Sequence, residues 1–300
     1  MSAAYVGGVE AGGTKFACAI GAGPREVVAE TTFPTTTPAE TLSRAVAFFR
    51  EHRAVPVRAV GIACFGPLDL SPASPTAGFI TDTTKPGWSR VDVAGAFRSL
   101  GIPVAIDTDV NGAALGEVRW GAGAGARSVV YVTVGTGIGG GAVVDGRRVH
   151  GLVHPEMGHM RIPRVDGDAF RGACSFHRDC LEGLASGRAL RERRGLPGEA
   201  LAEDDPVWAL EARYLAFGIS NVVTVLSPQR IVVGGGVMRR RGLLERVRGE
   251  VQAILAGYVR AAAITDAIAS YIVAPGLGER AGVLGAMALA QEDMADDGNR

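Results

Sequence analysis

The sequence predicts an α/β protein of two domains, and three observations carry that prediction. The chain has 300 residues, which is long for one hydrophobic core and sufficient for two. Its apolar share of 47% and charged share of 21% are those of an ordinary globular protein. Its glycines gather in short groups between strand-like runs, where the backbone turns or approaches a ligand closely. We expect domains at residues 1–121 and 122–300, with the last helix packing back on the first domain.

Charge and targeting features exclude several function classes. Lys+Arg and Asp+Glu are balanced at 31 each, so there is no basic surface for nucleic acid and no acidic tail. The first residues, MSAAYVGGVEAGG, lack the charged and apolar segments of a signal peptide. The apolar stretches are short and interrupted, which argues against a membrane span. Cys18 and Cys64 lie alone in apolar runs, as small core residues of a reduced compartment do. A cytoplasmic enzyme or binding protein is expected.

The first glycine group lies near the N-terminus. The stretch YVGGVEAGGTKFACAIGAG predicts a strand at Val6–Glu10, a turn, and an alternating strand that begins near Phe16. Taken alone, it favours a plain hairpin, since Gly-Gly turns are common. The alternative is a phosphate loop. Its N–H groups, hydroxyl and ammonium group would come from Gly12, Gly13, Thr14 and Lys15.

Acidic residues follow a later strand. An amphipathic helix is expected at AETLSRAVAFFREH and a buried strand at VRAVGIACFGPLDL. The next strand, Val104–Ile106, leads into Asp107-Thr108-Asp109. A helix is expected from near Asn111 to about Trp120. A carboxylate at the C-terminal end of a strand projects to where open α/β sheets bind ligands. Aspartate is also a common N-cap. One of the two can cap the helix while the other does chemistry.

Two further glycine groups follow later strands, and the first of them repeats the strand, glycine turn and strand of the N-terminal group. SVVYVTVGTGIGGGAVVDGRRVHG formally matches the dinucleotide fingerprint through Gly135, Gly137 and Gly140. That fingerprint needs a following helix, whereas apolar residues and an Asp-Gly pair predict another strand and a hairpin turn. A third group, Gly234–Gly236, follows the strand of RIVVGGGVM and precedes an expected helix. The two hairpins, each with a Gly-Thr element, suggest two related domains that face one nucleotide, and a third glycine group after a strand makes the pattern more specific.

Six motifs together resemble a known family. GGVEAGGTK, DTDVNGAALGE, VTVGTGIGGG, HPEMGH, CSFHRDCLEG and RIVVGGGV occur in this order, and the chain resembles the ROK family of sugar kinases over nearly its whole length. Glu10, the KPGW stretch and the DTDVN stretch resemble its fructokinase branch. The resemblance implies an actin/hexokinase-like (ribonuclease H-like) ATPase fold, two α/β domains with a cleft between them. The helix-turn-helix domain of the family's repressors is not expected, because the chain starts on the phosphate-loop strand.

The resemblance implies a function as well as a fold. It implies ATP-dependent phosphorylation of a hexose, with D-fructose converted to fructose 6-phosphate as the leading interpretation. Kinases of mannose, glucose or N-acetylated amino sugars are alternatives, and so is a non-catalytic sugar-sensing protein. The intact Asp109 and glycine groups argue against the sensor. A homodimer is implied too, as is Mg²⁺ that bridges the ATP phosphates and needs few protein ligands.

Site residues carry over position by position. Asp109 matches the family's catalytic aspartate, which accepts the proton of the sugar hydroxyl. Glu156, His159 and Glu182 match sugar contacts, and Asn111 does so more loosely. The residues expected to bind the nucleotide are Gly12, Gly13, Thr14, Lys15, Gly135, Thr136, Gly137, Arg188, Gly234, Gly235 and Gly236.

Two positions depart from the family pattern. Thr108 stands where glucokinase-type members carry asparagine. A hydroxyl cannot replace an amide that donates and accepts at once, so glucose is disfavoured as a substrate. Arg188 stands where relatives commonly have proline. Its guanidinium could reach a phosphate or remain solvated.

The stretch GACSFHRDCLEG holds a Cys-x-x-His-x-x-Cys pattern. A disulfide is not expected in a reduced compartment, where such spacing more often binds metal. A closed structural zinc site needs four ligands. The resemblance places the fourth at His159, with His150 and His154 as nearby alternatives and free thiols as the other interpretation. The expected zinc ligands are His159, Cys174, His177 and Cys180.

Overall fold

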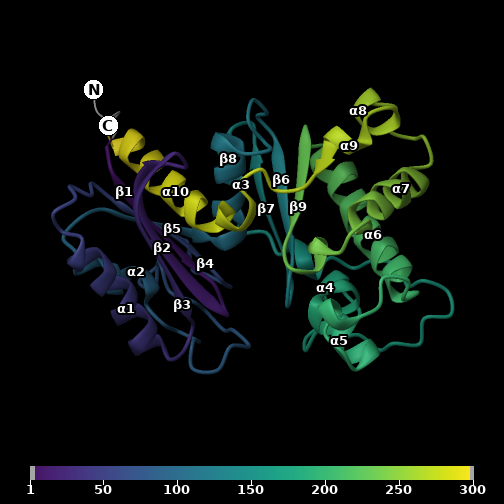
Figure 1. The fold of residues 1–300 in the computed structure, drawn as a ribbon, viewed down its shortest axis with the longest axis horizontal. Helices are drawn as coiled ribbons and strands as arrows, with labels where there is room; N and C mark the ends of the chain where they lie inside the picture. Colours follow the sequence, from purple (N-terminus) through teal and green to yellow (C-terminus); the bar gives the residue numbers. More distant parts are fainter. Residues whose placement is uncertain (1–3, 298–300) are drawn as a thin grey trace. The chain divides into compact units, whose positions relative to one another are not determined.

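The computed structural model describes residues 4–297, which form two compact units (Figure 1). Unit 1 comprises Met1–Ala124, Arg148–Pro155 and Gly276–Arg300, and unit 2 comprises Gly125–Arg147 and Glu156–Pro275. The sequence analysis placed the short segment Arg148–Pro155 in the second domain. Its contacts place it in unit 1 instead.

The sheet of unit 1 is mixed, in the order β3-β2-β1-β4-β5. Its strands are β1 (Val6–Ala11), β2 (Lys15–Gly23), β3 (Glu26–Pro34), β4 (Val60–Cys64) and β5 (Val104–Thr108). The first three strands are antiparallel neighbours, whereas β1, β4 and β5 run parallel. The predicted strands are therefore confirmed. Because β1, β4 and β5 end at one edge, the loops that follow them are neighbours.

Helices cover both faces of this sheet. They are α1 (Pro38–Glu51), α2 (Val93–Arg98), α3 (Asp109–Trp120) and α10 (Ala281–Asp297), with the 3-10 turn η4 (Gly278–Arg280) before α10. On one face, α1 and α2 bury Phe49 and Phe97 against strand residues such as Ile62. On the other, Met287 of α10 packs against Val6. Figure 1 shows α10, in yellow, along this sheet.

Glycines allow α10 to approach its neighbours at backbone distance. A Cβ atom at Gly61 of β4 would overlap the carbonyl oxygen of Ala286. A Cβ atom at Gly285 would overlap the backbone of Gly112 in α3 in the same way. Only a residue without a side chain fits at such close contacts. Helix α10 thus fixes both the sheet and α3, whose first residue is Asp109.

The start of α3 differs from the prediction. The helix begins at Asp109 rather than near Asn111. Its N-cap is Thr108, whose hydroxyl accepts a hydrogen bond from the Asn111 amide at 3.1 Å. The expectation that one of the two aspartates caps the helix is wrong, because threonine takes that role.

The sheet of unit 2 has the order β10-β9-β6-β7-β8. Its strands are β6 (Val129–Val134), β7 (Ile138–Val144), β8 (Arg147–Arg148), β9 (Arg230–Gly234) and β10 (Ile272–Val273). Strand β6 pairs antiparallel with β7 and parallel with β9. A strand follows the second glycine group, so the rejection of the dinucleotide fingerprint is confirmed. Asp145 and Gly146 have φ of 51° and 78°, as a tight hairpin turn requires.

The third glycine group does not lead directly into an α-helix. The 3-10 turn η3 (Val237–Arg239) follows it, and α7 begins only at Leu243. The remaining helical elements of unit 2 are η1 (Met157–His159), α4 (Leu181–Ala185), α5 (Gly187–Arg194), η2 (Gly198–Ala200), α6 (Val207–Leu226), α7 (Leu243–Leu255), α8 (Ala262–Thr265) and α9 (Ile268–Tyr271).

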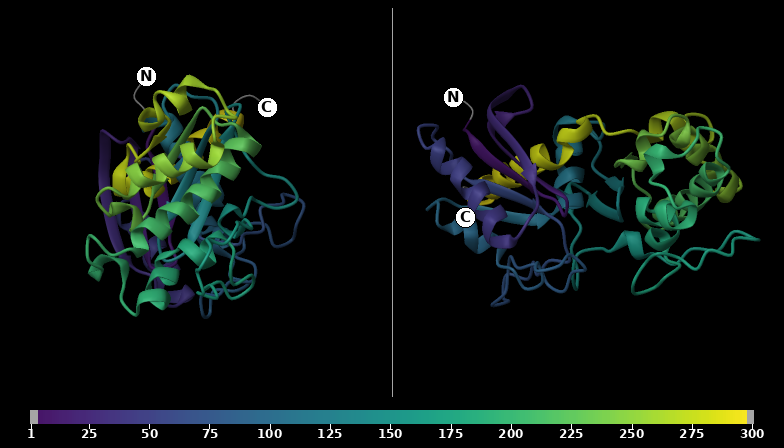
Figure 2. Two further views of the ribbon diagram at one scale, coloured as in Figure 1. Left: turned by 90° about the vertical axis from the view of Figure 1, so that its right-hand side faces the viewer. Right: turned by 60° about the horizontal axis from the view of Figure 1, so that its bottom comes forward.

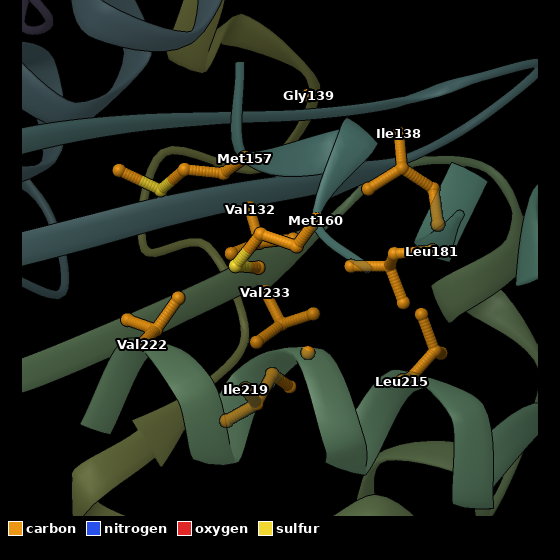
Figure 3. Close-up of a pocket in the computed structure, with 11 residues that line it drawn as sticks. Val132, Ile138, Gly139, Met157, Met160, Leu181, Leu215, Ile219, Val222 and Val233 are labelled. Carbon is orange, nitrogen blue, oxygen red and sulfur yellow. The ribbon is translucent and has the colours of Figure 1, made fainter. Parts of the chain in front are cut away.

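Helix α6 is the core helix of unit 2. In the left view of Figure 2, α6 and α7 lie in front of the strands of this unit. Leu215 and Ile219 of α6 face Val132 and Val233 of the sheet around an apolar cavity (Figure 3). Among residues 4–297, α6 is the one helix long and apolar enough to cross a membrane. The sequence analysis overlooked this apolar stretch, whose buried residues belong to a protein core.

Candidate active site

The first glycine loop joins β1 to β2 at the carboxyl edge of the unit 1 sheet. The Gly12 amide donates to the Lys15 carbonyl at 3.0 Å. Thr35 donates its hydroxyl to the Gly12 carbonyl and its amide to the Thr14 carbonyl, at 2.7 and 2.9 Å. Within the described chain, no hydrogen bond uses the amides of Gly13 and Thr14. The loop can therefore present two N–H groups to an anion, beside an exposed hydroxyl and ammonium group.

Asp109 follows β5 at the same edge. Strands β1, β4 and β5 end side by side, because Ala11 pairs with Cys64 and Cys64 pairs with Thr108. The backbones of Gly12 and Asp109, the next residues, are therefore two strand spacings apart, or about 10 Å. Its Oδ1 accepts a hydrogen bond from the Val110 amide at 2.9 Å. Burial raises the pKa of the Cys64 thiol, and the charge of Asp109 raises it further. The partly exposed carboxylate thus lies beside a neutral thiol, where it can accept a proton from a ligand.

Two residues that the sequence associated with sugar recognition are buried. Asn111 is 1% exposed, and its Nδ2 donates to Asp107 Oδ1 at 3.0 Å. Thr108 is 4% exposed and uses its hydroxyl as the cap of α3. The hydrogen bonds described for both side chains are to other residues of unit 1. The sugar contact expected of Asn111 stays a prediction.

The second and third glycine groups lie side by side in unit 2. Thr133 of β6 pairs with Gly234 of β9, so the loops after these parallel strands are adjacent. Gly235 has a φ of 97°, and a Cβ atom there would overlap the backbone of Val134. Glycine is required at this position for both reasons. The two groups therefore share one edge of the unit 2 sheet.

The second loop is held through its carbonyls. The first two amides of α5 donate to the carbonyls of Gly135 and Thr136, at 2.7 and 3.2 Å. The Gly135 amide donates to the Gly137 carbonyl at 2.9 Å. No hydrogen bond between described residues uses the amides of Thr136 and Gly137, which suits an anion. The Arg188 guanidinium instead lies along α5 and pairs with Glu192 at 2.8 Å.

Glu182 joins α4 to this loop. Its Oε2 accepts a hydrogen bond from the Ile138 amide at 3.0 Å. The same oxygen lies 2.5 Å from where a Cβ atom at Gly137 would be, so a larger residue there would displace the Glu182 carboxylate. Glu156 is exposed at the start of η1, and its carbonyl accepts from the His159 amide at 2.9 Å. Unit 2 therefore holds three predicted sugar-contacting residues together with two glycine loops.

Four predicted metal ligands come together in unit 2. The ligand atoms of His159, Cys174, His177 and Cys180 all lie within 4.8 Å of one another. His159 Nδ1 is 3.7 Å from Cys174 Sγ and 3.5 Å from Cys180 Sγ. Tetrahedral zinc with ordinary bond lengths places sulfur and nitrogen ligands about 3.6 Å apart. The distances therefore fit a four-coordinate zinc ion. Both cysteines are free, as ligation of a metal ion requires.

The alternative histidines have other partners. His154 is buried, and its Nε2 accepts a hydrogen bond from the Leu68 amide at 2.9 Å. His150 Nε2 lies 2.9 Å from Asp107 Oδ2.

Burial raises the pKa of the Cys180 thiol to about 12, so a bound cation is needed to hold it as a thiolate.

Sequence analysis missed two buried carboxylates. Asp107 is fully buried and accepts hydrogen bonds from four donors: the Thr108 amide, Asn111 Nδ2, His150 Nε2 and the Arg148 guanidinium. Burial raises the pKa of Asp107, but the hydrogen bond from His150 and the charge of Arg148 outweigh it and lower the pKa overall. The available signal was the first aspartate of the stretch Asp107-Thr108-Asp109.

Glu117 is the other missed carboxylate. It is fully buried near the end of α3. Its Oε2 accepts from the amides of Ala122 and Gly276 at 2.6 and 3.0 Å, and its Oε1 accepts from the Leu277 amide at 3.0 Å. These amides lie next to two of the points where the chain passes between the units, Ala124 and Gly276. Its signal was a charged residue within the small and apolar run 112–118 of α3.

Comparison with known proteins identifies the family. The model of the ROK family matches residues 6–293. The chain belongs to the ROK family. It is 47% identical to the fructokinase of Zymomonas mobilis over 296 residues, which cover 95% of each chain. The family assignment that the motifs predicted is therefore confirmed.

Solved ROK structures share the fold. The ROK hexokinase from Thermus thermophilus matches with a TM-score of 0.81 and 29% identity, covering 97% of this chain and 99% of that one. The ROK glucokinase from Streptomyces griseus, solved with glucose and AMPPNP, matches with a TM-score of 0.74 and 25% identity, covering 96% and 99%. These similarities confirm the two-domain α/β sugar-kinase fold.

Proposed function

We propose that this ROK protein is an ATP-dependent fructokinase that converts D-fructose to fructose 6-phosphate. The observation that carries the proposal is the edge of the unit 1 sheet, where Asp109 lies at the same end as the loop Gly12–Lys15. A proton acceptor and a phosphate loop are what phosphoryl transfer to a hydroxyl needs. The 47% identity to a fructokinase, against 30% to a glucokinase, supports fructose as the sugar.

Asp109 acts on the attacking group. The fructose hydroxyl oxygen forms a bond to the γ-phosphorus of ATP while the bond to the ADP oxygen breaks. The hydroxyl proton passes to the Asp109 carboxylate as the new bond forms. An ordinary carboxylate suffices because the hydroxyl becomes acidic only in the transition state. Most of the catalysis then comes from positioning and charge stabilisation.

The glycine loops bind the phosphates of ATP. The amides of Gly13, Thr14, Thr136 and Gly137 are the donors that no hydrogen bond between described residues uses. Such N–H groups stabilise negative charge without needing to reorganise. Lys15 adds an exposed ammonium group beside the first loop. ATP arrives as its Mg²⁺ complex, and the ion supplies further charge neutralisation. Gly234–Gly236 border the adenosine.

The cluster of His159, Cys174, His177 and Cys180 holds a structural Zn²⁺. Four ligands close the coordination sphere, so the ion stabilises the fold. The segment that it fixes carries Glu156 and Glu182, the carboxylates proposed to accept hydrogen bonds from the sugar. His159 turns its Nδ1 toward the sulfur atoms, which leaves Nε2 for a sugar hydroxyl or a carboxylate.

Product analysis tests the reaction. Purified protein is incubated with MgATP and D-fructose, and the products are followed by ³¹P NMR. We expect ADP and fructose 6-phosphate in equal amounts. The Asp109→Asn variant serves as the control for contaminating kinases. ADP without a sugar phosphate, or a phosphate on another carbon of fructose, contradicts the proposal.

A further inference from the structure

We propose that Asp107, together with Arg148 and His150, is a set of positioning residues that fixes the orientation of Asp109. The inference rests on the proposed function, because it takes Asp109 as the base. It assigns a role to the hydrogen-bond network around the fully buried Asp107. The argument has three parts: how Asp107 holds the backbone around Asp109, what holds Asp107, and how their charges balance.

One oxygen of Asp107 holds both sides of Asp109. Its Oδ1 accepts hydrogen bonds from the Thr108 amide at 2.7 Å and from Asn111 Nδ2 at 3.0 Å. These donors belong to the residue before Asp109 and to the second residue after it. The Thr108 hydroxyl closes the same turn by accepting from the Asn111 amide. A single carboxylate oxygen thus fixes the start of α3 and, with it, the direction of the Asp109 side chain.

The other oxygen of Asp107 anchors the segment that returns to unit 1. Its Oδ2 accepts hydrogen bonds from the Arg148 guanidinium and from His150 Nε2. Arg148 also donates through Nε to Glu292 Oε2 of α10 at 2.9 Å. The side chains of Asp107 and Arg148 are 0% and 25% exposed, so water screens this pair poorly. The set therefore connects β5, α3, α10 and the segment Arg148–Pro155.

The positive charge of Arg148 balances the negative charge of Asp107, and this balance affects the protonation of Asp109. An uncompensated carboxylate two residues from the base would disfavour a second negative charge there. Arg148 compensates Asp107 and is itself paired with Glu292. Of the other groups nearby, Arg119 interacts electrostatically with Glu292, and the buried thiol of Cys64 faces Asp109 without a charge. Asp107 also pairs with His150, which is charged only when protonated. Removal of Arg148 alone therefore makes the charge around Asp107 and Glu292, beside the base, more negative by one unit.

The first test is Asp107→Asn. Asparagine offers one acceptor oxygen and adds a donor, so it cannot accept all four hydrogen bonds. We expect kcat for fructose to fall about 10- to 100-fold, as a misplaced catalytic group causes, with KM for ATP nearly unchanged. The matched control is Arg213→Gln, which breaks a half-buried ion pair with Glu250 in unit 2. We expect wild-type kinetics from that control.

The second test is the pH profile of Arg148→Gln. The base must be deprotonated to work, and an unpaired negative charge on Asp107 makes deprotonation harder. The acid limb of kcat should therefore move to higher pH, by about half a unit or more. The double variant Asp107→Asn/Arg148→Gln removes both charges and should return the limb toward its wild-type position. A merely structural role would lower the amount of folded enzyme without moving the limb.

Hydrogen exchange supplies a measurement that does not depend on activity. The amides of Val110 and Asn111 should exchange faster in Asp107→Asn than in the wild type or in Arg213→Gln. Unchanged exchange, or an unchanged kcat together with an unmoved acid limb, would overturn the positioning role. A wild type that phosphorylates no sugar would contradict the proposed function instead. The exchange rates would still decide whether Asp107 orders the start of α3.

Discussion

Asp109 is a single carboxylate at the first residue of a helix, and its removal tests its role as the base. In Asp109→Asn, the side-chain oxygen can still accept from the Val110 amide but cannot take a proton. We expect kcat to fall about 10²- to 10⁴-fold, the usual effect of losing a general base. Dissociation constants for ATP and fructose, measured by calorimetry, should change little. A variant with near wild-type kcat would show that another group is the base.

Single residues differ in how well sequence alone reveals them. The glycine loops, Asp109 and the Cys-x-x-His-x-x-Cys pattern are local, so their spacing along the chain carries their chemistry. Asp107 depends on Arg148, 41 residues away, and no periodicity links the two. The same holds for His150, which the sequence suggested only as an alternative metal ligand. Buried polar networks form through tertiary contacts, which is why these partners were missed.

The four proposed zinc ligands, His159, Cys174, His177 and Cys180, come from several short segments of unit 2, and loss of the proposed zinc should be measurable. Elemental analysis should find about one zinc per chain, because the four ligands close one tetrahedral site. Cys174→Ser and Cys180→Ser should each lose this zinc, lower the thermal midpoint and raise KM for fructose more than KM for ATP.

A buried cysteine outside the cluster provides the control. Cys18 lies in β2 and is fully buried, so Cys18→Ala should retain the zinc. Wild-type stability and fructose kinetics in protein stripped of zinc would overturn the structural role of the metal.

Glu117 links the end of α3 to two places where the chain changes units. Glutamine at this position keeps one acceptor oxygen and turns an NH₂ group toward backbone amides that lose their partner. We expect Glu117→Gln to lower the free energy of unfolding by about 2–4 kcal/mol, measured in urea. Glu250→Gln breaks a half-exposed ion pair and should cost less than about 1 kcal/mol. Equal stability of the two variants would contradict the anchoring role.

Elements were predicted best where the apolar pattern is regular. The strands β1, β2, β6 and β7 alternate or are continuously apolar, and the structure has them where the pattern indicates. The start of α3 was misplaced because threonine, flanked by two aspartates, caps the helix. The helix after the third glycine group was misjudged because η3 intervenes before α7. Local hydrogen bonds decide such boundaries.

At the scale of the molecule, two similar glycine hairpins correctly indicated two α/β units. The return of the C-terminal helix to the first unit was also expected, and Gly61 and Gly285 show how closely that helix packs there. The return of Arg148–Pro155 was not foreseen. It follows from the hydrogen bonds of Arg148, His150 and His154 to unit 1 residues, which the sequence order does not reveal.

Substrate preference tests the central claim most directly. A coupled assay of ADP release measures kcat/KM for fructose, glucose, mannose and an N-acetylated amino sugar, with Asp109→Asn as background. We predict the highest value for fructose, at least about tenfold above that for glucose, because a polar sugar site penalises unpaired groups. A value for glucose equal to or above that for fructose would contradict the fructokinase assignment. ADP release at the background rate with every sugar would contradict the kinase itself.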